Sequence, residues 1–210
     1  MKLNARRSVR ILILLFLLIR ISPPVPGQVR LPRLISDGMV LQRDARVRLW
    51  GWAANLEKIS VVFLDSVYQT TADDKGEWNV LLSGLKAGGP FTMTVNASNT
   101  ITINDILIGD VWVCSGQSNM ELPVRRVSWV YGTEIVNSDN PYIRHFAVPQ
   151  KYNFNTPEHD LGSGKWESAT PTNVLNFSAV AYFFATELYN KYHVPIGLRS
   201  EEHTSELQSR

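Results

Sequence analysis

The stretch Asp105-Ile-Leu-Ile-Gly-Asp-Val-Trp-Val-Cys-Ser-Gly-Gln-Ser-Asn-Met120 decides the class of fold. From Ile106 to Val113 it is an almost continuous apolar run, as in a parallel strand that is buried on both faces. Small residues follow at once and predict a tight turn. Further on, Asn176–His193 carries apolar residues on one face, which predicts a helix with Asn176 as its N-cap. Because Val194–Leu198 then reads as another strand, this half of the chain predicts an α/β domain with a parallel sheet.

The residues before this stretch follow a different pattern. Short apolar or alternating runs are separated by turns rich in Asp and Gly, which favours a small antiparallel β-sandwich. We therefore expect a β-sandwich-like domain over residues 28–104 and the first part of an α/β domain over residues 105–198. The strands expected in the first domain are Met39–Leu41, Val47–Trp52, Ile59–Leu64, Tyr68–Thr71, Trp78–Leu82, Phe91–Asn96 and Thr100–Ile103.

Both ends of the chain are expected to lie outside the fold. Residues 1–27 combine a basic start, the apolar run Ile11–Ile19 and a Pro-rich exit that ends at Gly27, the pattern of a secretory signal peptide. The run is too short for a membrane-spanning helix, which needs roughly 20 residues. We expect export to a secreted, periplasmic or lysosomal location without stable membrane insertion after cleavage; a membrane-anchored N-terminus is the alternative.

Residues 199–210 are polar and have no periodic apolar face. They resemble the conceptual translation of a widely used sequencing adapter. We therefore expect a non-native tail that takes no part in the fold.

The charge of the chain excludes some partners. The formal net charge of the 210 residues is +2, but residues 28–198 hold 14 Lys and Arg against 16 Asp and Glu. No dense basic stripe occurs there, so no nucleic-acid partner is expected. The single cysteine, Cys114, excludes an intramolecular disulfide and a Cys-based zinc site. Since it precedes the turn from a buried strand, we interpret it as a small core residue.

The turn itself has the composition of a nucleophile site. Ser118 follows the carboxyl end of a buried strand, which is where open α/β sheets bind ligands. Its hydroxyl could be acylated and deacylated if a base lies nearby, and the amides of a following helix could stabilise an oxyanion. Met120 stands where the Gly-x-Ser-x-Gly elbow has its last glycine, which argues against an α/β-hydrolase. From composition alone, a structural serine remains the more frequent case.

The run Gly109–Glu121 resembles the signature of the sialate O-acetylesterase family, a branch of the SGNH-type carbohydrate esterases. The resemblance implies an SGNH-hydrolase-like parallel-sheet domain, an O-acetylated carbohydrate as substrate, and neither a cofactor nor a metal. It makes Ser118 the nucleophile and the Ser118 backbone N–H one oxyanion donor, with Gly116, Gln117 and Asn119 flanking it. Further family-like segments are Asp37–Arg43, Trp50–Trp52, Ala87–Phe91, Phe177–Phe184 and Val194–Gly197.

The resemblance also implies groups that we do not find. The family would need a glycine and an asparagine as further oxyanion donors, and a histidine base in an Asp-x-x-His pair. No such pair occurs, because the residues three positions before His145, His159 and His193 are Tyr142, Thr156 and Asn190. We therefore expect the N-terminal portion of a longer esterase, which carries the nucleophile without its base and has little activity on its own.

The histidines have plainer interpretations. His145 lies in a strand-like run and His193 ends the expected helix, so both are read as structural. His159, between Glu158 and Asp160, is read as part of a solvated loop rather than a metal site, because adjacent loop residues rarely converge on one ion.

Two other groups could touch a sugar. Arg125 and Arg126 could bind the carboxylate of a sialic acid, although a solvated surface is the simpler interpretation. Trp50, Trp52 and Trp78 could form a platform for sugar stacking, but aromatic strand residues more often belong to the core.

Three functions remain open from the sequence. The first is an exported serine esterase that removes O-acetyl groups from sialic acids or related sugars. The second is an acetyl esterase that acts on xylan or another plant glycan. The third is a secreted, non-catalytic carbohydrate-binding β-sandwich protein.

Overall fold

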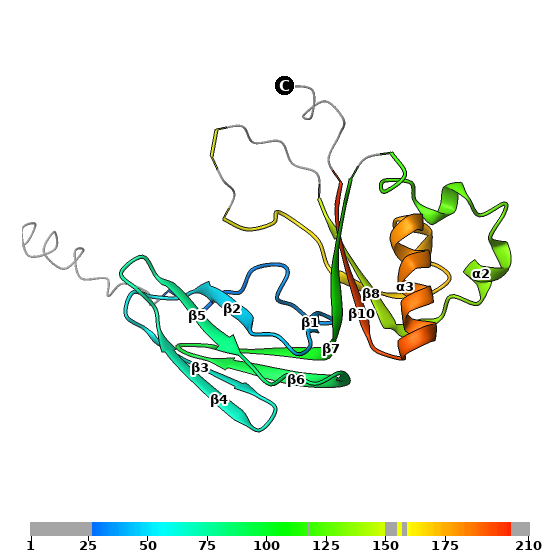
Figure 1. Ribbon diagram of the computed structural model, residues 1–210. Helices are drawn as coiled ribbons and strands as arrows, with labels where there is room; N and C mark the ends of the chain where they lie inside the picture. The colour runs from blue at the N-terminus through cyan, green and yellow to red at the C-terminus, as the bar shows by residue number, and fades with distance from the viewer. Residues whose placement is uncertain (1–26, 117, 150–154, 157–158, 203–210) are drawn as a thin grey trace, which may run out of the picture.

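The computed structural model describes residues 27–116, 118–149, 155–156 and 159–202 (Figure 1). Its α-helices are α2 (Gly132–Val136) and α3 (Ala179–Tyr192), with short 3-10 helices at Val124–Arg126 and Val174–Asn176. Its strands are β1 (Val40–Gln42), β2 (Val47–Trp52), β3 (Lys58–Phe63), β4 (Ser66–Thr71), β5 (Glu77–Leu82), β6 (Gly88–Asn96), β7 (Thr100–Gly116), β8 (Asn140–Val148), β9 (Trp166–Ala169) and β10 (Ile196–Glu202).

The fold is mixed α/β, as predicted, and the long strand β7 connects its parts. The main sheet has the order β4-β3-β6-β7-β10-β8-β9, with β1 also paired to β7. Up to Ile108, β7 runs antiparallel to β6, and from Asp110 onward it runs parallel to β10. The strand expected over Thr100–Ile103 forms, but it does not end there: it continues into the buried run through Asp105, whose φ is +58°. The division into a sandwich and a second domain at residues 104 and 105 stays a prediction.

The first half of the chain packs in two layers. β2 and β5 form a separate antiparallel pair. In β3 and β5 every second side chain is buried, because alternate residues of a strand point to opposite faces. These side chains share one core with residues of β6. The remaining expected strands form as predicted, with ends that shift by up to three residues.

The second half has the predicted parallel sheet. β10 lies between β7 and β8 and is parallel to both. Helix α3 covers one face of this sheet (Figure 1). Phe177, Tyr182 and Ala185 pack there against Ile196 and Leu198 of β10 in a second core.

Helix α3 starts later than predicted. Its N-cap is Ser178, whose Oγ accepts a hydrogen bond from the Ala181 N–H at 3.4 Å. The prediction of Asn176 as N-cap is therefore wrong, because Asn176 ends a 3-10 helix. Phe177 is fully buried and its backbone is extended (φ −74°, ψ 151°). Because an extended residue cannot belong to a helix, α3 begins only after Phe177. At the other end, His193 caps α3 in the left-handed conformation.

The last strand is longer than predicted. β10 continues through Glu202, so residues 199–202 belong to the sheet, contrary to the expectation that the fold ends at Leu198. Ladder hydrogen bonds use backbone groups and tolerate most side chains, and the small Ser200 fits a fully buried position. That residues 199–210 are non-native stays a prediction, since residues 203–210 lie outside the described part of the chain.

The predicted signal peptide lies almost wholly outside the described residues as well. Among the helices that are described, none is both long and apolar enough to cross a membrane.

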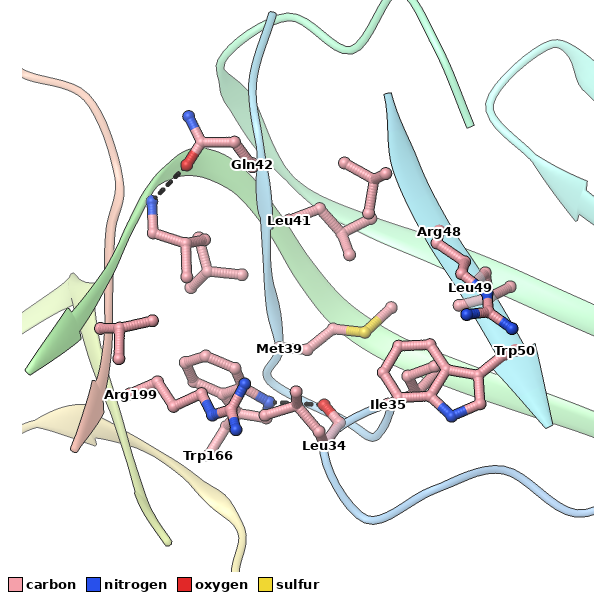
Figure 2. Close-up of a pocket in the computed structure, with 14 residues that line it drawn as sticks. Leu34, Ile35, Met39, Leu41, Gln42, Arg48, Leu49, Trp50, Trp166 and Arg199 are labelled. Carbon is pink, nitrogen blue, oxygen red and sulfur yellow. Dashed lines mark hydrogen bonds between the residues drawn. The ribbon is translucent and has the colours of Figure 1, made fainter. Parts of the chain in front are cut away.

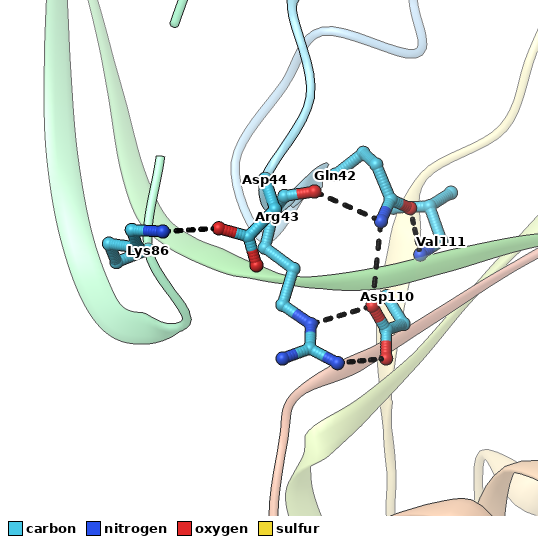
Figure 3. Close-up of polar contacts among 6 residues, drawn as sticks. All are labelled: Gln42, Arg43, Asp44, Lys86, Asp110 and Val111. Atoms are coloured by element: carbon cyan, nitrogen blue, oxygen red, sulfur yellow. Dashed lines mark hydrogen bonds and ion pairs between the residues drawn. The ribbon is translucent and has the colours of Figure 1, made fainter. Parts of the chain in front are cut away.

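Polar contacts fix the loop after β1 against β7 (Figure 3). The Arg43 guanidinium donates two hydrogen bonds to the Asp110 carboxylate, at 2.8 and 3.1 Å. The Gln42 side chain accepts from the Val111 N–H at 2.8 Å. Beside them, the exposed Lys86 and Asp44 form an ion pair at 2.5 Å.

A buried arginine makes the deeper connection between the two halves. Arg144 of β8 is 4% exposed. Its Nη1 donates to the carbonyl oxygens of Gly38 and Asp105, at 3.0 and 3.1 Å, and its Nη2 donates to the Asp105 carboxylate at 2.9 Å. Its Nε donates to the Pro141 carbonyl oxygen at 2.9 Å. Arg144 thus holds the bend of β7 at Asp105.

Candidate active site

Ser118 lies on a sharp turn beyond the carboxyl end of β7. Gly116, the last residue of the strand, has φ +153°, and Ser118 has φ +48°. A left-handed conformation is uncommon for a serine, and such strain occurs often at functional turns. The side chains of Ser118 and Asn119 are exposed, whereas Gln117 lies outside the described residues. The structure thus presents the predicted serine to solvent.

The segment after Ser118 is attached to the start of α3. The Ala179 N–H donates to the Leu122 carbonyl oxygen at 2.8 Å, and the Val124 N–H donates to that of Phe177 at 3.0 Å. The Ser178 hydroxyl lies 3.4 Å from the Met120 sulfur. Because these contacts join the segment after Ser118 to the start of α3, the serine turn is held on the α3 side of the sheet (Figure 1).

The helix expected directly after the serine does not form. The segment forms only a 3-10 turn, Val124–Arg126, and two of its three amides are already bonded: Val124 to Phe177 and Arg126 to Pro123. The Ser118 N–H, in contrast, donates to no described residue. It therefore remains available for the predicted role of an oxyanion donor.

His193 and Ser118 lie at opposite ends of the parallel strands. It precedes β10, whose first residue Ile196 pairs with Asp110, whereas Glu202 pairs with Gly116. At about 3.3 Å per residue, this register places the two ends of the strands roughly 20 Å apart. His193 is therefore the helix cap that the sequence predicted.

His145 is a buried structural residue, as predicted. It is 3% exposed, its Nε2 lies 2.8 Å from the Ser200 Oγ, and its ring lies 4.5 Å from that of Phe177. Burial lowers the pKa of His145 to about 4, although the Glu167 carboxylate acts in the opposite direction. The imidazole is therefore neutral near pH 7.

His159 lies in the exposed loop between β8 and β9. The neighbouring Asp160 carboxylate accepts the Arg33 N–H at 3.0 Å, which holds this loop on the side of the sheet away from α3 (Figure 1). Glu158 lies outside the described residues, and those that are described contain no group of three potential metal ligands. The structure thus brings none of these three histidines to the serine turn.

Arg125, Arg126 and Cys114 lie where their simpler interpretations place them, the arginines on the surface and the cysteine in the core. Arg125 and Arg126 are exposed, and Arg125 donates to the Asn176 Oδ1 at 2.8 Å. Cys114 is buried beneath α3, and burial raises the pKa of its thiol.

The three tryptophans do not form a common platform. Trp78 is buried, and Trp52 is half-buried with the Arg30 guanidinium 5.6 Å from its ring centre. Trp50 lines a mainly apolar cavity of about 200 Å³ with Met39, Trp166 and Arg199 (Figure 2). That cavity lies on the face of the parallel sheet away from α3, and Ser118 does not line it.

Comparisons with known proteins show what the chain is similar to. No family model matches the chain. Sialate O-acetylesterase from Rattus norvegicus is 30% identical over 90% of this chain and 38% of its own length. The human sialate O-acetylesterase is 29% identical over 80% of this chain and 36% of its own length. The crystal structure of a carbohydrate acetylesterase from Xanthomonas citri superimposes with a TM-score of 0.78 at 37% identity, over 83% of this chain and 40% of that one.

The chain therefore spans less than two fifths of the length of these curated relatives. Over these residues the chain is homologous to sialate O-acetylesterases and to a carbohydrate acetylesterase.

Proposed function

We propose that this chain carries the nucleophile of a serine esterase that removes O-acetyl groups from carbohydrates. The observation that supports this most is the conformation of Ser118, which is exposed and left-handed at the carboxyl end of a buried parallel strand. The names of the relatives, which are sialate and carbohydrate acetylesterases, support the same chemistry.

In the proposed reaction, the Ser118 Oγ attacks the carbonyl carbon of the acetyl group while its proton passes to a base. The oxyanion that forms is stabilised by the Ser118 N–H. The intermediate collapses, the sugar hydroxyl leaves with a proton, and an acetyl-serine remains. Water then attacks this ester and releases acetate. The described histidines lie away from Ser118, so we propose that the base is not among the described residues and that this chain alone turns over slowly.

We propose O-acetylated sialic acid as the substrate, since the curated relatives carry that name. The exposed Arg125 and Arg126 follow the serine turn and are available to a carboxylate. An acetylated neutral glycan such as xylan is the second candidate, because the Xanthomonas citri relative is named for carbohydrates in general. A non-catalytic sugar binder is less well supported, because Trp50, Trp52 and Trp78 form no common platform.

We further propose that the parallel sheet with α3 is the start of an SGNH-hydrolase-like domain, and that the layers before it form a β-sandwich. The shared core of β2, β3, β5 and β6 supports the sandwich. Export by cleavage of residues 1–27 is proposed on the pattern of the leader alone.

Acetate release tests the proposed function. The chain is incubated with O-acetylated sialic acid and with acetylated xylan, with and without added imidazole as a substitute base. We expect imidazole to accelerate acetate release by the unmodified chain and not by Ser118→Ala. Ser115→Ala, which removes an exposed serine near the end of β7, is the matched control and should behave like the unmodified chain. Equal release by the unmodified chain and Ser118→Ala under all conditions would remove Ser118 as the nucleophile.

A further inference from the structure

A large cavity lies between α2 and α3, away from the serine turn. Its volume is about 710 Å³, within the range of small-molecule sites. Ile143, which lines it, pairs with Ile196 of β10, which in turn pairs with Asp110 of β7. Asp110 precedes Gly116 by six residues, so this cavity opens roughly 20 Å from the serine end of the sheet. It is therefore separate from the candidate active site.

Aromatic rings form one wall of this cavity. The Tyr131 ring lies 4.6 Å from that of Phe183, and the Phe183 ring lies 5.4 Å from that of Tyr182. Tyr182 is buried, whereas Tyr131 is 37% exposed at the opening. Aromatic rings with polar tips suit a ligand that has both apolar faces and hydroxyl groups.

Polar groups that can bond to hydroxyls also line this cavity. The side-chain amides of Asn137 and Asn190 face this space and make no hydrogen bond to any residue in the described ranges. Each amide offers two donors and one acceptor. Thr133 adds a hydroxyl at the start of α2.

The charge of the cavity has one sign. Glu134, Asp139 and Glu187 contribute carboxylates, and none of them forms an ion pair within the part of the chain that the structure describes. Burial raises the pKa of the Tyr182 hydroxyl and outweighs contacts with Thr186 and Ser138, which lower it; the Glu134 carboxylate adds a smaller rise, so this group stays neutral. No lysine, arginine or histidine is among the described lining residues. An anionic sugar would therefore be repelled.

We propose that this cavity is a second carbohydrate-binding site, selective for uncharged sugar units. The aromatic wall, the amides of Asn137 and Asn190 and the carboxylates around the cavity support this proposal. The proposal does not depend on Ser118 being a nucleophile. Bound there, a neutral part of a glycan would be held apart from the turn at which esters are proposed to react. The site would thus recognise the glycan chain rather than the acetyl group.

Titration calorimetry tests the proposal with the full chain. The probes are lactose, xylobiose and chitobiose, with sialyllactose as an anionic counterpart of lactose. At least one neutral disaccharide should bind saturably, and sialyllactose should bind more weakly than lactose. Replacing the exposed ring in Tyr131→Ala, or the free amide in Asn190→Ala, should weaken binding by roughly tenfold, as expected for the loss of one aromatic or polar contact.

Tyr192→Ala is the matched control, because this exposed tyrosine of α3 does not line the cavity. It should leave the affinity unchanged, and circular dichroism should show native folding for every variant. The proposal is overturned if no neutral disaccharide binds, if sialyllactose binds as tightly as lactose, or if Tyr131→Ala and Asn190→Ala bind like the unmodified chain. Ser118→Ala should bind these sugars normally, which separates this proposal from the proposed esterase activity.

Discussion

Replacing Arg144 with methionine should destabilise the fold far more than the same change at Arg43. Both arginines pair with an aspartate of β7, but their surroundings differ. The Arg144 side chain is 5% exposed, whereas that of Arg43 is 34% exposed. Methionine keeps most of the apolar stem in both cases, so the comparison isolates the guanidinium groups and their burial.

The size of the effect follows from the contacts that are lost. Arg144→Met leaves the buried Gly38 carbonyl oxygen and the Asp105 carbonyl oxygen without their donor, and removes the pair with the Asp105 carboxylate. The Asp105 side chain is 54% exposed, so its ion pair with Arg144 contributes about 1 kcal/mol or less. Each of the two carbonyl oxygens that loses its donor costs about 1–3 kcal/mol, so Arg144→Met should cost about 3–5 kcal/mol in all. The Arg43–Asp110 pair is partly solvated, and its loss should cost about 1 kcal/mol or less. At roughly 3 °C per kcal/mol for a chain of this size, the Tm should fall by about 9–15 °C and about 3 °C, respectively.

Thermal unfolding followed by circular dichroism measures both variants under one condition. A free energy of unfolding from urea titration provides an independent value. If Arg144→Met is no less stable than Arg43→Met, then Arg144 does not hold the bend of β7, and the account of how the two halves are joined is wrong.

Three further predictions concern stability and reactivity. The pKa of His145 is about 4 in the folded chain, against an ordinary value of 6.5. As the pH falls, His145 therefore takes up a proton in the unfolded chain before it does so in the folded chain. The free energy of unfolding should thus decrease by about 3 kcal/mol between pH 6.5 and pH 4. Urea titrations should show a smaller loss over that range for His145→Gln, while the exposed His159→Gln should match the unmodified chain. Gly109→Ala should lower the Tm by several degrees or prevent folding, because its Cβ would overlap the carbonyl oxygen of Pro195; a Tm like that of the unmodified chain would contradict the register of β7 and β10. Burial and a raised pKa should make the Cys114 thiol react with a disulfide reagent far more slowly in the folded chain than in urea, and equal rates would show that this position is open.

Most strands could be predicted because their signals are local. Alternation in β5 and the continuous apolar run of β7 each require only a few neighbouring residues. The serine turn could be predicted for the same reason, since small residues follow the run directly. The short elements α2 and β9 hold too few residues to show a period, and they were not expected.

The remaining features depend on contacts between distant residues. Asn104 and Asp105 read as a break between strands, yet β7 passes through them because Arg144 binds Asp105 from 39 positions away. Asn176 resembles an N-cap, but burial of Phe177 moves the start of α3 to Ser178. The cavity between α2 and α3 likewise assembles residues of three separate segments. None of these contacts leaves a local pattern in the sequence.

The central claim is that Ser118 becomes acetylated. Mass spectrometry of peptides after incubation with an aryl acetate tests it most directly, because an activated ester acylates even where the base is missing, and hydrolysis of the acetyl-serine should then be slow. The account predicts one acetyl group on the peptide that contains Ser118, absent after denaturation in urea before labelling and absent in Ser118→Ala. Acetylation of Ser115 to the same extent, or none at Ser118 in the folded chain, would contradict it.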